Sequence, residues 1–145
     1  MTAVCQGLAS TFDAGAGYSA YLWSNGAVTQ TINPSVAGTF TVTVTDANGC
    51  QNNTSLALTL NALPQPVING DFEFCIGDNS TITAGVGYAS YIWNTGATAS
   101  SVNVTTAGNY AVTVTDGNGC VGSTSATVIV KCTAYTCNQW VDTNL

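Results

Sequence analysis

Residues 41–50 read TVTVTDANGC, and residues 111–120 read AVTVTDGNGC. In both stretches apolar and polar residues alternate with a period of two, which is the pattern of a β-strand with one buried face. Asn-Gly after such a strand is typical of a tight hairpin turn, for which we expect the type I′ conformation with positive φ at both residues. The sequence therefore predicts one β-hairpin that occurs twice.

The repetition extends well beyond this hairpin. The segment CQGLASTFDAGAGYSAYLWSNGA from Cys5 aligns with CIGDNSTITAGVGYASYIWNTGA from Cys75, and the offset of seventy residues holds without insertion as far as Leu60. Self-similarity at a fixed period indicates one structural unit used twice, and this period is long enough for a small domain. We predict domains at residues 1–62 and 63–131, joined near Pro64 and Pro66, and a C-terminal tail at residues 132–145.

Alternating segments of strand length fill each repeat, and none has helical spacing. Six or seven short strands per repeat, separated by Gly-bearing turns, predict an all-β fold of two tandem immunoglobulin-like (PKD-like) antiparallel β-sandwiches. The aromatic strand of each repeat places two large rings on one face, as expected for a core. The predicted core residues are Tyr21, Trp23, Tyr91 and Trp93.

Two consecutive motifs carry a resemblance to a known group of proteins. The pattern Y-x-x-Y-x-W-x-x-G is followed in both repeats by A-G-x-(F/Y)-x-V-T-V-T-D-x-N-G-C. This arrangement resembles the Ig-like and PKD-like modules of large, repetitive surface adhesins from gliding and type IX-secreting Bacteroidota. The resemblance implies an extracellular, non-catalytic module used in adhesion or as a stalk. The typical PKD turn has Asp near the Trp strand, whereas this chain has Asn25 and Thr95, so the calcium role of that turn is not carried over.

The charge composition excludes several classes of function. The chain has no His and no Arg, and Lys131 is the single basic residue against seven carboxylates, for a net charge of −6. Binding of nucleic acid by phosphate neutralisation and attraction to anionic membranes both need a basic surface. Acid–base or nucleophilic catalysis needs groups that this chain largely lacks. We therefore expect no enzyme activity and no cofactor.

No apolar run is long enough for a membrane helix, so membrane insertion is not expected. A signal peptide is also missing, so we expect Met1 to begin a processed or truncated product. Six cysteines in this short chain indicate an oxidising compartment, and we expect an extracellular or cell-surface location. The absence of His and of C-x-x-C argues against zinc.

The cysteine spacing suggests particular disulfides. Cys5 precedes Cys50 by 45 residues, and Cys75 precedes Cys120 by the same number, which predicts the bridges Cys5–Cys50 and Cys75–Cys120. Cys132 and Cys137 follow the last repeat strand. They are expected to close a local loop, with a cross-link to a neighbouring chain as the alternative.

Two sets of residues are candidates for ligand binding. Asp46 with Asn48, and Asp116 with Asn118, offer oxygens to calcium, but too few for its usual coordination, so the simpler interpretation is that they form the hairpin turns and that no metal binds. Tyr18 and Tyr88 are expected opposite the Trp face of their strands, with the apolar residues Leu22 and Ile92. There they could stack on surface glycans, or a loop could cover them.

The two repeats differ in what precedes their first cysteine. LPQPVINGDFEF precedes Cys75, whereas MTAV alone precedes Cys5, so the first domain is expected to be short of its first strand. The tail has no equivalent in either repeat and contains the apolar residues Tyr135, Trp140 and Val141. We hypothesise that the tail of one copy is a donor strand for the first domain of the next, which would give a head-to-tail filament. The alternative is a slice of a longer array whose tail folds back on its own domain.

These observations together predict a structural subunit or segment of an extracellular bacterial fibre or adhesin stalk. Its expected partners are copies of itself. The alternative is a glycan-binding module of a secreted surface protein.

Overall fold

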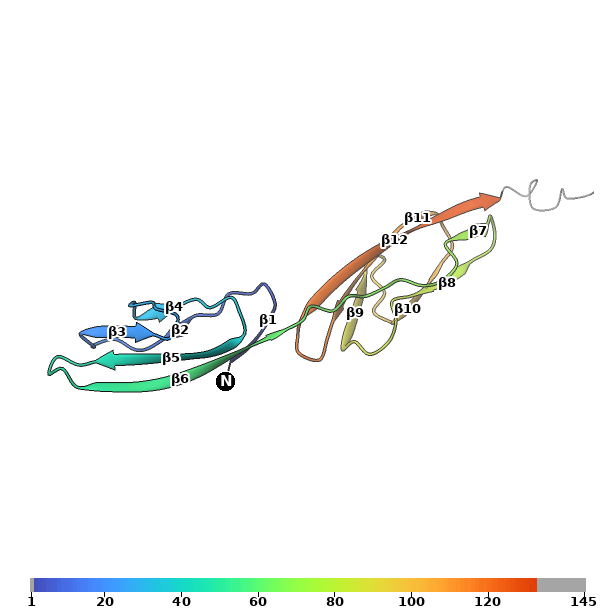
Figure 1. Cartoon of the computed structure of the whole chain (residues 1–145). Coiled ribbons are helices and arrows are strands. Elements are labelled where there is room, and N and C mark those ends of the chain that lie inside the picture. Colours follow the sequence, from blue (N-terminus) through green and yellow to red (C-terminus); the bar gives the residue numbers. More distant parts are fainter. Residues whose placement is uncertain (1, 133–145) are drawn as a thin grey trace, which may run out of the picture. The chain divides into compact units, whose positions relative to one another are not determined.

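The computed structural model describes residues 2–132, so Tyr135, Cys137, Trp140 and Val141 lie outside the described residues. The chain divides into two compact units, Met1–Ala62 and Leu63–Leu145, called unit 1 and unit 2 below. All secondary structure in the described residues consists of β-strands (Figure 1). The predicted all-β fold is confirmed.

Unit 1 is an immunoglobulin-like sandwich of two sheets. The larger sheet has the order β1-β6-β5-β3, and the smaller one pairs β2 with β4. The strands are β1 (Thr2–Cys5), β2 (Phe12–Asp13), β3 (Ala20–Trp23), β4 (Thr31–Ile32), β5 (Gly38–Thr45) and β6 (Gln51–Asn61).

Unit 2 repeats this topology. Its larger sheet has the order β7-β12-β11-β9, and β8 pairs with β10 in the smaller sheet. The strands are β7 (Glu73–Cys75), β8 (Ser80–Thr83), β9 (Ser90–Trp93), β10 (Ser101–Val104), β11 (Gly108–Thr115) and β12 (Val121–Cys132). Each strand of unit 2 has its counterpart about seventy residues earlier, so the two units can be compared residue by residue.

The first strand of each unit runs parallel to the last one. In unit 1, Thr2 lies opposite Leu58 and Cys5 lies opposite Asn61. The remaining pairs are antiparallel, so the expectation of purely antiparallel sheets is wrong for this one pair in each unit. The Trp-bearing strands β3 and β9 lie at the edges of their sheets.

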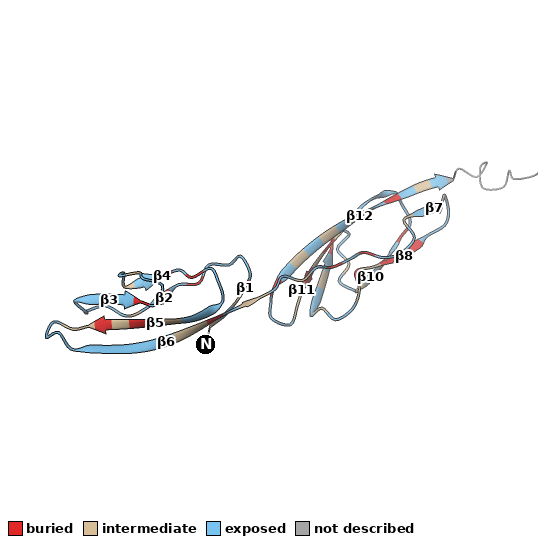
Figure 2. Ribbon diagram, viewed as in Figure 1, coloured by how far each residue is buried: buried red, intermediate tan, exposed pale blue. Residues whose placement is uncertain are grey.

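Each unit has its own set of buried residues (Figure 2), and a tryptophan is the largest fully buried side chain of each. Trp23 and Trp93 are each 1% exposed, and their indole N–H groups donate to the carbonyl oxygens of Thr29 at 2.8 Å and of Ala99 at 2.9 Å. These bonds matter because a buried indole N–H without an acceptor would be destabilising. Tyr21 and Tyr91 pack against the same cores.

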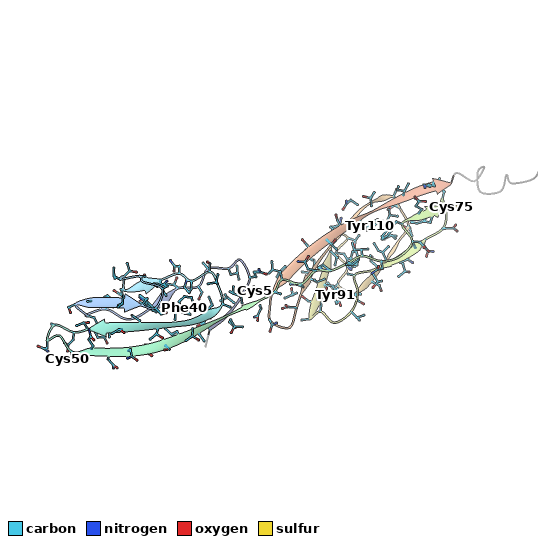
Figure 3. All side chains as sticks on the ribbon, viewed as in Figure 1. Cys5, Phe40, Cys50, Cys75, Tyr91 and Tyr110 are labelled. Carbon is cyan, nitrogen blue, oxygen red and sulfur yellow. The ribbon has the colours of Figure 1, made fainter. Side chains whose placement is uncertain are left out.

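The two cores differ at an aromatic position on the first strand of the long hairpin, Phe40 of β5 and Tyr110 of β11 (Figure 3). In unit 2 the Tyr110 hydroxyl donates to the Thr106 carbonyl at 2.9 Å, as in the tyrosine corner of immunoglobulin-like folds. Unit 1 has Phe40 there, and its ring packs edge-on against Phe12 with centroids 5.8 Å apart. Unit 1 thus replaces a side-chain hydrogen bond by an aromatic pair.

The hairpin turns are not of the predicted type I′. The Gly49 N–H donates to the Asp46 carbonyl at 3.1 Å, and the Asp46 N–H donates to the Cys50 carbonyl at 2.9 Å. Gly49 has a φ of 83°, whereas no described residue other than glycine has positive φ. Residues 47 and 48 therefore form the centre of a type I turn, and Gly49 adopts the left-handed conformation that closes this three-residue hairpin loop.

In unit 2 an extended segment before β7, residues 64–70, covers the core; we call it the covering segment. Pro66 and Ile68 are buried, while residues 65, 67 and 69 are exposed. Asn69 pairs with Thr83 of β8 through two backbone hydrogen bonds of 2.9 and 2.8 Å. At the other end, the Pro64 carbonyl lies so close to Gly122 of β12 that a β-carbon at that position would collide with it.

We predict that Gly122→Ala destabilises the protein by about 1–3 kcal/mol, because the new methyl group must displace the covering segment. Gly117→Ala is the matched control, since a β-carbon at Gly117 meets nothing within 4 Å and its backbone is not left-handed. Urea unfolding of both full-length variants measures the difference. Equal stability of the two variants would contradict the close packing of Pro64 on Gly122.

Candidate functional site

The recurring acidic residues are engaged in their own turns. One carboxylate oxygen of Asp46 accepts the backbone N–H groups of Asn48 and Cys50, both at 2.8 Å, and Asp116 makes the equivalent bonds at 2.8 and 2.9 Å. Within residues 2–132 no group of three or more His, Cys, Asp or Glu side chains is placed to hold a metal ion. The calcium candidates therefore have a clear structural role as caps of the hairpin turns.

Asp13 holds a negative charge at the edge of the small sheet of unit 1. The side-chain amide of Gln30 at 2.9 Å and the Gly15 N–H at 2.8 Å lower the pKa of this exposed carboxyl group. A lowered pKa means that the ionised form favours the folded loop. The resulting contribution to stability is fully present above the pKa that Asp13 has in the unfolded chain. It is lost as the pH falls through the lower pKa of Asp13 in the folded protein.

The structure contradicts the predicted disulfide Cys5–Cys50, because Cys50 is a free, exposed cysteine. The parallel pairing of β1 with β6 explains the error. Cys5 lies opposite Asn61 at one end of β6, and Cys50 precedes the other end of this strand. Eleven residues of extended chain span about 36 Å, whereas bonded cysteines have Cα atoms within about 7 Å of each other.

The same geometry argues against the predicted bridge Cys75–Cys120. Cys75 lies opposite Cys132 at the end of β12, while Cys120 precedes the first residue of this strand. Cys5, Cys75 and Cys120 are nevertheless all disulfide-bonded. The bonded cysteines fit an oxidising compartment, but the pairing within each repeat is wrong. The predicted bridge Cys132–Cys137 lies outside the described residues.

We predict that Cys50 in the native protein reacts with iodoacetamide without prior reduction, whereas Cys5, Cys75 and Cys120 do so only after reduction. The reason is that Cys50 is an exposed thiol and the other three are oxidised. Mass spectrometry of peptides from the alkylated protein gives the result directly. A peptide that joins Cys5 to Cys50 would contradict this structure.

Tyr18 and Tyr88 lie on the core side of their units. Each packs edge-on against the tyrosine of the aromatic strand, with centroids 6.0 Å apart for Tyr18 and Tyr21 and 5.8 Å for Tyr88 and Tyr91. Leu22 and Ile92 are 55% and 59% exposed on the outer face. The expectation that these tyrosines lie opposite the Trp face, beside Leu22 and Ile92, is therefore wrong.

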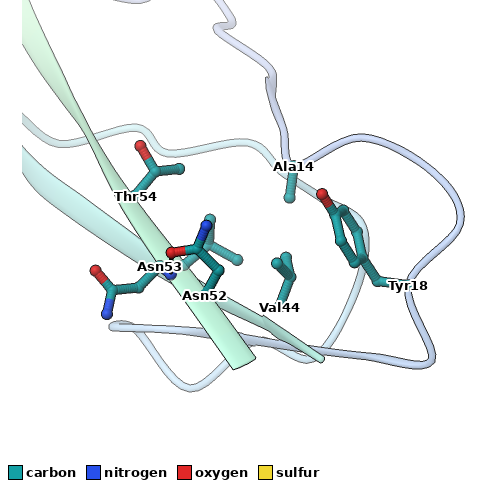
Figure 4. A pocket seen from close by; sticks show the side chains of 7 residues that line it. Ala14, Tyr18, Val44, Asn52, Asn53 and Thr54 are labelled. Carbon is teal, nitrogen blue, oxygen red and sulfur yellow. Dashed lines mark hydrogen bonds between the residues drawn. The ribbon is translucent and has the colours of Figure 1, made fainter. Parts of the chain in front are cut away.

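Unit 1 has a groove of about 110 Å³ beside Tyr18 (Figure 4). We call it the unit 1 groove. Figure 4 shows Tyr18 and Ala14 on one side of it, and Asn52 and Thr54 of β6 on the other. Val42 and Val44 of β5 also line it, so an apolar surface lies between the Ala14 and Tyr18 side and the polar wall of β6. Sequence reasoning missed this groove because its walls come from strands that are distant in the chain.

The chain matches no protein-family model and no curated protein sequence. Among solved structures it is similar to murine CEACAM1b, with 12% identity, a TM-score of 0.39, and coverage of 89% of this chain and 96% of that one. It is similar to the N-terminal four Ig domains of Dscam1 isoform 1.9, with 14% identity, a TM-score of 0.41, and coverage of 90% and 43%.

A third similar structure is SGBP-B of the Bacteroides ovatus mixed-linkage glucan utilization locus, in complex with a mixed-linkage heptasaccharide. Its identity is 16%, its TM-score 0.33, and the match covers 88% of this chain and 42% of that one. The chain thus spans less than half of the Dscam1 and SGBP-B chains. These overall similarities are low, and the immunoglobulin-like assignment rests on the strand order described above. The described residues contain no helix that could cross a membrane.

Proposed function

We propose that this chain is a structural subunit or segment of an extracellular bacterial fibre or adhesin stalk. The observation that carries the proposal is the reuse of one sandwich: both units have the same strand order, the same Trp anchor and the same capped hairpin. Duplication of a whole domain adds length and does not require an active site.

Two further features support an extracellular structural role. Within the described residues Cys5, Cys75 and Cys120 are oxidised, which is typical of proteins outside the cytosol. Charged residues make up 6% of the sequence, and the outward positions of the long strands are mostly Thr, Ser and Asn. This polar, weakly charged surface and the acidic side chains used as turn caps are consistent with a non-catalytic module.

We further propose that copies of the chain associate head to tail through their termini. Strand addition to an exposed sheet edge supplies main-chain hydrogen bonds, and an interface between two different surfaces propagates without closing. The sequence following β12 contains the apolar residues Tyr135, Trp140 and Val141, which we propose to contribute to this contact.

Electron microscopy of the purified full chain, beside a copy lacking residues 133–145, tests this function. We expect filaments from the full chain and none from the shortened copy, because the shortened copy lacks the donor segment. Dispersed particles from both proteins would contradict self-assembly and leave a segment of a longer adhesin.

The glycan-binding alternative predicts a different result. Binding of the full chain to a glycan array, lost in Tyr18→Ala or Tyr88→Ala but kept in Leu22→Ala, would favour it. An array without any bound glycan would favour the structural function.

A further inference from the structure

The long hairpin of unit 1 extends beyond the small sheet that packs against it. β5 and β6 have 8 and 11 residues, whereas β2 and β4 have 2 each. Along the inner face of β6, Leu56 lies opposite Phe40, Thr54 opposite Val42 and Asn52 opposite Val44. Leu56 packs against the core, but Thr54 and Asn52 are exposed although they point to the inner side. The end of this hairpin is therefore open where a sandwich is normally closed.

In unit 2 the equivalent positions are covered. Tyr18 is 42% exposed whereas Tyr88 is half-buried, and Ala14 is half-buried whereas Ala84 is 1% exposed. Thr54 and Asn52 are exposed, while their counterparts Thr124 and Gly122 are half-buried. All four positions are more exposed in unit 1 than in unit 2. Because the topology and most of the lining residues are the same, the difference points to the covering segment of unit 2.

The covering segment spans the place that corresponds to the unit 1 groove. It begins where the Pro64 carbonyl lies against Gly122, and it reaches Thr83 through the backbone pairing of Asn69. The counterparts of Gly122 and Thr83 are Asn52, in the wall of the groove, and Asp13, next to Ala14 in the opposite wall. Ile68, between the two ends, belongs to the buried core of unit 2. Within the described residues of unit 1, no segment makes the corresponding pairing with Asp13.

We infer that the unit 1 groove is the acceptor for residues 133–145 of a second copy of this chain. This inference rests on the proposed head-to-tail function and names its site. The six residues from Pro64 to Asn69 are enough to cross the equivalent place in unit 2, so a segment of this length suffices. The donor binds as an extended strand, with its backbone paired to Asp13 and one apolar side chain in the position of Ile68.

Trp140 is the donor residue that fits this position. Asn52 replaces Gly122 in unit 1, so its side chain holds the donor backbone farther from β6 than Pro64 lies from β12. The wider space accommodates a side chain larger than isoleucine. The exposed ring of Tyr18 offers an aromatic partner to the indole, and aromatic pairs add to the gain from burial alone. Val141 then follows at the place of Asn69, where its backbone meets Asp13.

Binding of synthetic peptides to the full chain at low concentration tests the inference. The probe is a fluorescent peptide of residues 133–145 with Cys137 replaced by Ser to prevent thiol exchange, and binding is measured by anisotropy. We expect saturable binding, weakened at least about tenfold when the peptide carries Trp140→Ala, since buried Trp anchors dominate such interfaces.

Two full-length variants locate the binding site. Ala14→Ile places extra bulk in the groove, and we expect it to abolish peptide binding and filaments alike. Ala20→Ile is the matched control, because Ala20 is exposed on β3 and does not line the groove. Far-ultraviolet circular dichroism checks that both variants are folded. Equal binding of the tail peptide to Ala14→Ile and to the unmodified protein would overturn the groove as the acceptor.

A second peptide, LPQPVING from residues 63–70, distinguishes the occupant. If this peptide binds the groove and the tail peptide does not, the tail is not the occupant and the inference is overturned. Binding of the tail peptide that is lost in Ala14→Ile, without filaments of the full chain, would sustain the groove and contradict the proposed fibre. Filaments that need the tail but persist in Ala14→Ile would sustain the fibre and contradict the groove.

Discussion

The inner face of the long hairpin of each unit must be covered, and the other elements of the unit are arranged to cover it. Apolar residues recur along β5 and along β11, but the small opposing sheet has strands of 2 residues in unit 1 and 4 in unit 2. Apolar surface left in water costs about 25 cal/mol for each Å². Each unit therefore depends on further elements to close its sandwich: the Trp at the sheet edge, the tyrosine beside it and, in unit 2, the covering segment.

The pairing of the first strand with the last one has consequences for the cysteines. β1 and β7 run parallel to the ends of β6 and β12, so the first cysteine of each repeat lies far from the cysteine of the hairpin turn. Immunoglobulin domains often use a disulfide between their two sheets as a core element. Here the Trp is held by its hydrogen bond to a backbone carbonyl and by the apolar residues of both sheets.

Local features could be predicted from the sequence, and pairings between distant strands could not. The alternation in residues 41–45 and the aromatic residues of β3 identified the strands and their buried face, because both signals lie within a few residues of each other. The equal spacing of Cys5–Cys50 and Cys75–Cys120 reflects the duplication and is compatible with any pairing. The prediction of the side of the sheet on which Tyr18 lies is also wrong, because Tyr18 precedes β3 and does not follow the alternation of the strand. The groove has no local signal, since residues from three parts of unit 1 form it.

Unit 1 offers the same edge that unit 2 closes with its own chain. Hydrogen–deuterium exchange of the full chain, followed at the amides of Asp13 and Thr83, tests this most directly. In unit 2 the Thr83 N–H donates to the Asn69 carbonyl at 2.8 Å, so it should exchange slowly at every protein concentration. We expect fast exchange at Asp13 in dilute protein and slow exchange in filaments. An Asp13 amide that exchanges at the same rate in both states would contradict this expectation.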